Sequence, residues 1–173
     1  MSRSLLKEVV LTALFVALVA IATMAIKIPT GATQGYLNVG EAVIFCAALW
    51  FGPRTGAIAG GLGSALADVL TGYAVWAPWT LIIKGTEGLL VGLLAHRAFV
   101  RRQALSPRTV GAMVAGAIWM VLGYYLASVV VLQGFAPALA TIPENGLQGL
   151  ASVVLGAVLV RAFRGVKGLV GQH

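Results

Sequence analysis

The feature that most constrains this chain is its first apolar segment, which runs from Val9 to Ile26 without a charged residue. At 1.5 Å per residue a helix of this length is about 27 Å long, close to the apolar thickness of a bilayer. A basic start before an apolar stretch is also typical of a signal peptide, but this segment is long enough to span and five more apolar segments follow it. The sequence therefore predicts an integral membrane bundle of about six transmembrane helices.

The six expected helices cover residues 5–26, 39–51, 55–70, 78–99, 110–132 and 143–163. The second is short for a span, at about 20 Å. Pro78 and Pro143 open the fourth and sixth helices, at a position where proline is favoured. A Gly/Thr-rich loop over residues 30–36 follows the first helix. We expect an all-α fold with one six-helix membrane domain over residues 1–173.

Composition excludes a soluble domain. Only 10% of the residues are charged and 60% are hydrophobic, whereas a soluble domain carries about 25% charged residues. The net charge of +7 would suit nucleic acid, but the basic residues stand in short runs between apolar segments, so no nucleic-acid partner is expected. The single cysteine, Cys46, rules out a disulfide framework.

The distribution of Lys and Arg predicts the orientation, because cytoplasmic loops of membrane proteins carry an excess of both. With six helices, one side holds ten basic residues and the opposite side holds only Lys27. We therefore predict that both termini are cytoplasmic. The ten are Arg3, Lys7, Arg54, Arg97, Arg101, Arg102, Arg108, Arg161, Arg164 and Lys167.

Small residues recur every four positions along the third helix, which predicts close packing against another helix of the bundle. The first helix carries a second small pair, Ala13 and Ala17, one turn apart. Alanine is common in apolar helices, so this pair alone is weak evidence for a docking face. The residues of the third-helix stripe are Gly52, Gly56, Gly60, Ser64, Asp68 and Gly72.

Lys84, Glu87 and Asp68 are ionisable residues within the apolar helices, where such groups are costly and usually face a cavity or each other. Lys84 and Glu87 are three residues apart and share a helix face. They form either a polar wall of a binding cavity or an ion pair that closes the bundle. Asp68, near the outer end of its helix, either anchors the following loop or touches a ligand.

Polar and aromatic residues also gather in the outer halves of the last two helices. Glu144, Asn145 and Gln148 open the sixth helix, while Tyr124 and Ser128 share a face of the fifth. A carboxylate at a helix N-terminus is also a normal cap, and aromatic residues near an interface often form a belt. The pattern predicts an outward-facing pocket for a small polar solute with an aromatic ring, with the glycine-rich loop as a lid.

No catalytic motif is present. The chain lacks GxxxxGK[ST], HExxH and GxSxG, so we expect neither ATP hydrolysis nor another enzyme activity, and no metal or cofactor. The absence of evident inverted repeats also argues against a self-sufficient secondary transporter.

Five stretches together resemble the substrate-binding S components of energy-coupling factor (ECF) vitamin transporters, in the branch with riboflavin, pyrimidine and pyridoxine members. The resemblance covers nearly the whole chain, although the fifth helix shows no distinctive substrate signature. The stretches are Gly35–Glu41, Phe51–Gly56, Gly60–Asp68, Ala77–Gly88 and Pro143–Gln148.

The resemblance implies a six-helix fold with an outer pocket capped by the first loop. It implies that Ala13 and Ala17 meet a transmembrane coupling subunit, and that two ATPase subunits complete the transporter. The S component of such a transporter rotates in the membrane to carry its vitamin inward. Together with the residue patterns above, it gives a predicted substrate-binding set of Tyr36, Asn38, Lys84, Glu87, Tyr124, Glu144, Asn145 and Gln148.

The expected function is high-affinity vitamin binding in a prokaryotic cell membrane, with a pyridoxine- or hydroxymethylpyrimidine-like substrate first and riboflavin second. A self-sufficient secondary transporter of a small organic solute, driven through Glu87 or Asp68, is the alternative. A membrane scaffold in which Lys84 and Glu87 only hold helices together is a third.

Overall fold

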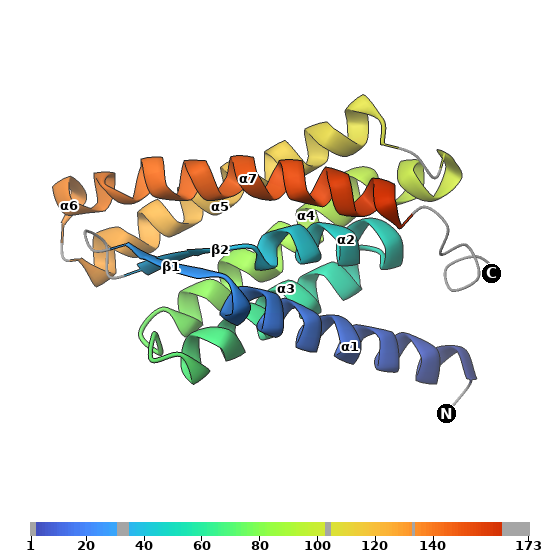
Figure 1. Ribbon diagram of the computed structural model, residues 1–173, viewed down its shortest axis with the longest axis horizontal. Coiled ribbons are helices and arrows are strands. Elements are labelled where there is room, and N and C mark those ends of the chain that lie inside the picture. The colour runs from blue at the N-terminus through green and yellow to red at the C-terminus, as the bar shows by residue number, and fades with distance from the viewer. Residues whose placement is uncertain (1–2, 31–34, 103–104, 133, 164–173) are drawn as a thin grey trace.

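Six long helices form the bundle, in agreement with the predicted all-α membrane fold (Figure 1). The computed structural model describes residues 3–30, 35–102, 105–132 and 134–163, so Arg164 and Lys167 lie outside the described residues, as do residues 31–34 of the predicted loop. The long helices are α1 (Arg3–Ala25), α2 (Gly40–Phe51), α3 (Pro53–Leu70), α4 (Ala77–Arg102), α5 (Pro107–Val131) and α7 (Thr141–Ala162).

Two elements were not predicted. The segment expected to be a loop contributes to an antiparallel hairpin of β1 (Lys27–Thr30) and β2 (Gly35–Asn38), with Lys27 paired to Asn38 and Thr30 to Gly35. A short helix, α6 (Phe135–Leu139), precedes α7. The pairing of β1 with β2 supplies hydrogen-bond partners for backbone N–H and C=O groups where the hairpin covers the bundle. An irregular loop at this place would leave more of these groups without partners.

The two ends of the bundle differ. The start of α1 and the end of α7 lie at one end, whereas the hairpin, α6 and the connection between α3 and α4 lie at the other (Figure 1). Because the six long helices cross the bundle an even number of times, the start of α1 and the end of α7 lie at the same end. The hairpin end is the end that holds the candidate site.

The predicted small-residue stripe packs α3 against α4. A Cβ atom on Gly60 would lie 2.5 Å from the carbonyl oxygen of Lys84, and one on Gly61 would lie 2.8 Å from that of Leu81. Side chains larger than glycine would therefore force the two backbones apart. The prediction of internal packing is confirmed, and this close approach fixes where Lys84 enters the bundle.

The core and the lipid-facing surface are distributed unevenly among the helices. The short helix α2 is the most deeply placed, with Ile44, Phe45 and Leu49 fully buried. Among the described residues, three segments are long and apolar enough to cross a membrane alone, 5–25, 107–131 and 135–162. α3 and α4 fall short of that apolarity, because they carry glycines and charged residues inside the bundle.

Candidate functional site

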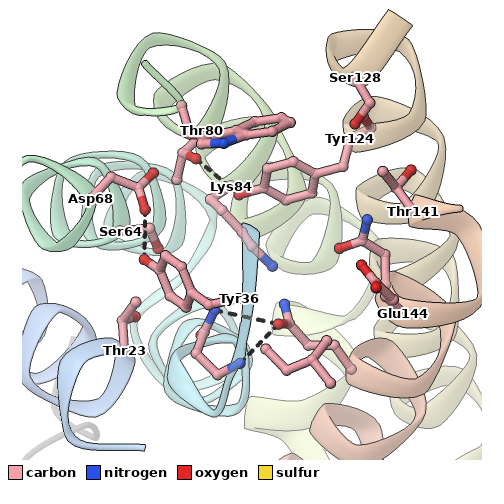
Figure 2. Close-up of a pocket in the computed structure, with 15 residues that line it drawn as sticks. Thr23, Tyr36, Ser64, Asp68, Thr80, Lys84, Tyr124, Ser128, Thr141 and Glu144 are labelled. Atoms are coloured by element: carbon pink, nitrogen blue, oxygen red, sulfur yellow. Dashed lines mark hydrogen bonds between the residues drawn. The ribbon is translucent and has the colours of Figure 1, made fainter. Parts of the chain in front are cut away.

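A cavity of about 60 Å³ lies at the hairpin end, and its lining comes from α1, β2, α3, α4, α5 and α7. Figure 2 shows Asp68, Ser64 and Thr23 along one side and Tyr124, Thr141 and Glu144 along the other, with the Lys84 side chain between them. The lining residues are Thr23, Tyr36, Leu37, Asn38, Ser64, Asp68, Trp76, Thr80, Lys84, Tyr124, Ser128, Thr141, Glu144, Asn145 and Gln148.

Seven of the eight predicted substrate-binding residues line this cavity, and Glu87 does not. Glu87 is fully buried behind Lys84. The sequence set lacked Thr23, Ser64 and Thr80, which also line the cavity. Hydroxyl residues in membrane helices often bond to their own backbone, so their presence in the sequence is a weak signal for a site.

A buried charge cluster supports the cavity from below. The Lys84 ammonium lies 2.8 Å from a Glu41 oxygen and 3.1 Å from a Glu87 oxygen, with all three side chains at most 3% exposed. A Lys84–Glu87 ion pair was one of the two alternatives that the sequence left open, and Glu41 was not predicted as a partner. Its signal was a carboxylate in the first turn of an apolar helix, where the helix dipole favours negative charge.

A chain of hydrogen bonds joins the hairpin to this cluster. The backbone and side-chain amides of Asn38 donate to Gln148 Oε1 at 2.9 and 3.3 Å. Gln148 Nε2 in turn donates to the Glu41 carboxylate at 3.2 Å. Gln148 of α7 therefore connects Asn38 of β2 to Glu41 of α2 through hydrogen bonds. A displacement of the hairpin would change the contacts of the buried charge cluster.

The hairpin is also fastened to the connection between α3 and α4. The Tyr36 hydroxyl donates to Asp68 Oδ1 at 2.5 Å. The Lys27 ammonium lies 5.0 Å from the Tyr36 ring centroid and 4.5 Å from that of Tyr73. Burial, and then the negative charge of Asp68, raise the pKa of the Tyr36 hydroxyl above its usual range, so it remains a proton donor.

Aromatic rings complete the site on the side of α4 and α5. The Trp76 and Tyr124 ring centroids are 6.3 Å apart, and the Tyr124 hydroxyl lies 3.0 Å from that of Thr80. The Lys84 ammonium is 5.9 Å from the Tyr124 ring. Such a wall suits a flat ring with a few polar substituents, because stacking area and fixed hydrogen bonds are both present.

The predicted docking residues lie elsewhere. Ala13 and Ala17 are both exposed on the outer surface of α1, away from the cavity lining. A helical membrane bundle with a small polar cavity at one end has the features of a solute-binding membrane protein. Sequence and structure comparisons identify its family.

Residues 4–164 match the family of the ECF-type riboflavin transporter, S component. An uncharacterized protein in the gap 3′ region of Pyrococcus woesei is 43% identical over 141 residues, which cover 82% of this chain and 90% of the relative. A UPF0397 protein of Streptococcus pneumoniae is 29% identical over 96% of this chain and 94% of its own. The chain therefore belongs to the ECF-type riboflavin transporter S-component family.

The fold agrees with this assignment. The crystal structure of the S component for biotin from an ECF-type ABC transporter matches with a TM-score of 0.53, covering 93% of this chain and 95% of that chain at 18% identity. The resemblance found in the sequence is confirmed. By its family, the protein is a multi-pass cell-membrane protein and an S component of a vitamin transporter.

Proposed function

We propose that this chain binds a small, single-ring vitamin or vitamin precursor with high affinity, and delivers it to an ECF-type ABC transporter. A pyridoxine- or hydroxymethylpyrimidine-like compound is the first choice, and riboflavin the second. The observation that supports this order is the size of the cavity together with its polar and aromatic lining.

Cavity size favours the smaller substrates. An apolar cavity of about 150 Å³ accepts a benzene molecule, whereas this one encloses about 60 Å³ with the hairpin in place. The site must therefore widen even for one ring. Riboflavin, with three fused rings and a sugar-alcohol chain, would require several times more widening and a larger displacement of the hairpin.

Lys84 suits recognition of a ring substituent as well as helix packing. An ammonium has three N–H donors. One is donated to Glu41, and Glu87 lies 3.1 Å from the nitrogen as an ion-pair partner. Because Lys84 lines the cavity, we assign a remaining donor to a hydroxyl oxygen or ring nitrogen of the substrate. Asn145 and Glu144, at the start of α7, face the same space and supply further polar contacts.

The proposal includes an orientation and partners. Ten Lys and Arg residues stand on one side of the six-helix topology, which supports cytoplasmic termini and a cavity that opens outward. The exposed pair Ala13 and Ala17 supports docking of a transmembrane coupling subunit on α1. Two ATPase subunits would supply the energy.

The test begins with the purified chain in detergent, without ATP. Mass spectrometry would identify small molecules that the purified protein retains. Titration calorimetry would compare its affinities for pyridoxine, hydroxymethylpyrimidine and riboflavin. We expect the affinity for a single-ring compound to be higher than that for riboflavin. Tighter binding of riboflavin would reverse the order of substrates. Binding of no vitamin in this class would overturn the proposal.

Transport distinguishes an S component from a secondary transporter. We expect vesicles to accumulate the substrate only when the coupling subunit, both ATPase subunits and ATP are present. Undiminished uptake by this chain alone, abolished by an uncoupler, would instead establish the self-sufficient transporter.

A further inference from the structure

The side of the cavity formed by α1 and α3 holds two buried polar atoms that have no hydrogen-bond partner among the described residues. They are Asp68 Oδ2 and Thr23 Oγ1. Asp68 is 3% exposed and Thr23 is 1% exposed, and both line the cavity with Ser64 (Figure 2). Tyr36 satisfies only the other carboxylate oxygen, Oδ1.

Such atoms are unusual. Most buried side-chain polar atoms in proteins have a partner, and one left without a partner is destabilising, the more so when it is charged. Both residues line the space that the proposed substrate would occupy. A ligand that donates a hydrogen bond to Asp68 Oδ2 would remove this cost on binding.

Asp68 makes no ion pair within 4 Å among the described residues. The ion pairs found there are Lys84–Glu41 and Lys84–Glu87, so the ammonium that lines the cavity already lies close to two other carboxyl groups. Lys27 lies against the rings of Tyr36 and Tyr73. Both lysines act on Asp68 only from a longer distance, so its second carboxylate oxygen has no direct positive partner among these residues.

We propose that Asp68, with Thr23 on the same side, is a subsite for an ammonium group of the substrate. An ionised carboxylate only accepts hydrogen bonds, and burial strengthens its attraction for a positive donor. The inference rests on the proposed function, which makes this cavity the substrate site. It adds that an amine-bearing heteroaromatic ring binds better than its neutral or anionic counterparts.

Pyridoxamine and pyridoxine are a matched pair of probes, because one carries an aminomethyl group where the other carries a hydroxymethyl group. Calorimetry on the purified full chain would give wild-type affinity that is higher for pyridoxamine. In Asp68→Asn, pyridoxamine affinity falls about 10- to 100-fold, as expected for a charge-assisted hydrogen bond, and pyridoxine affinity falls far less. The Asn side chain still offers an oxygen to Tyr36, so the hairpin contact is kept.

Two further variants separate recognition from structure. Tyr36→Phe removes the bond to Asp68 but leaves the carboxylate, and it should affect both probes equally. Thr23→Val is isosteric and should lower pyridoxamine affinity about 2- to 10-fold, which provides a second readout if Asp68→Asn does not fold.

The outcomes distinguish the two proposals. Equal loss of both probes in Asp68→Asn, or no preference for pyridoxamine in the wild type, overturns the subsite and leaves the proposed function standing. Binding of neither probe, nor of any other single-ring vitamin, overturns both.

Discussion

The Lys84 ammonium lies 2.8 Å from the Glu41 carboxylate and joins α4 to α2 through an ion pair in which neither side chain is more than 3% exposed. Glu87 lies 3.1 Å from the same ammonium, so one cation stands against two buried carboxyl groups. Lys84 therefore has two roles in this site. It is the positive partner of these buried groups, and it lines the cavity.

Replacement of Lys84 by methionine should destabilise the protein as well as weaken ligand binding. The change leaves Glu41 and Glu87 buried without a cation, and breaking a buried pair in this way costs about 3–5 kcal/mol. Thermal unfolding in detergent measures this loss. Glu87→Gln is the matched control, because it keeps the shape and leaves one carboxylate for one ammonium, so its melting temperature should change far less. A Lys84→Met variant as stable as the wild type would contradict the role of the cluster.

Replacement of Tyr36 by phenylalanine should accelerate release of the ligand. The change removes the hydrogen bond to Asp68 that fastens the hairpin over the cavity, which is worth about 1.5–3 kcal/mol for a charged acceptor. Stopped-flow measurement of the dissociation rate checks this. Tyr73→Phe keeps the ring beside Lys27 and Tyr36 and serves as the control. Equal dissociation rates of the ligand in the two variants would show that the Tyr36–Asp68 bond does not hold the hairpin closed.

The same bond has a pH dependence. Burial and Asp68 raise the pKa of Tyr36 in the folded protein, so the hydroxyl still donates where an ordinary tyrosine, with a pKa near ~10, begins to ionise. Above that pH the unfolded chain loses the proton and the folded chain does not. The stability of the wild type should therefore fall with rising pH relative to Tyr36→Phe.

Gln148→Leu should uncouple the hairpin from the charge cluster. The substitution removes the acceptor of two Asn38 bonds and one donor to Glu41. We expect ligand affinity to fall about tenfold or more, consistent with roughly 1–3 kcal/mol for buried groups left unpaired. Hydrogen exchange at the Asn38 amide should be faster than in the wild type. Leu147→Ala, at a position 60% exposed on the same helix, is the control and should leave that exchange rate unchanged.

Ala17→Leu should abolish uptake without affecting ligand binding, because it adds bulk to the exposed face of α1 proposed to meet the coupling subunit. Uptake in vesicles and calorimetry on the isolated chain measure the two properties separately. Ala151→Leu adds the same bulk at an exposed position of α7 and should transport normally. If both variants transport equally well, the docking face lies elsewhere.

Gly60→Ala should destabilise the bundle by about 1–3 kcal/mol, the usual cost of overpacking. The new methyl group would lie 2.5 Å from the carbonyl oxygen of Lys84, and a backbone atom cannot turn aside. Gly111→Ala is the control, because nothing lies within 4 Å of a Cβ at that position. Thermal unfolding of the two variants should differ clearly, and equal melting temperatures would contradict the close approach of α3 and α4.

The sequence revealed the cavity residues better than the contacts among them. Lys84 and Gln148 stood out because polar residues are few in these helices, Asn38 came from the resemblance to S components, and all three line the cavity. The Lys84–Glu41 pair joins residues 43 positions apart on different helices, and no periodicity within one helix reveals such a partner.

The hairpin was hidden for a different reason. Its strands are four residues each, too short to show a clear alternation, and the glycines and threonines around them are typical of loops. The prediction of a covering segment at this place was right in position and wrong in secondary structure. The hydroxyls of Thr23 and Ser64 are only a weak signal in the sequence, because it is the packing of α1 beside α3 that brings them to the cavity.

The lower apolarity of α3 and α4 has a consequence for how the chain reaches its membrane. A lysine near the centre of a single inserting helix costs about 2.5–3.5 kcal/mol, and α4 also carries Glu87. These two helices are joined by a short connection and touch along their glycines. They should therefore leave the translocation machinery as a pair, after α1 and α2 have been delivered, with Glu41 already in place to receive the lysine.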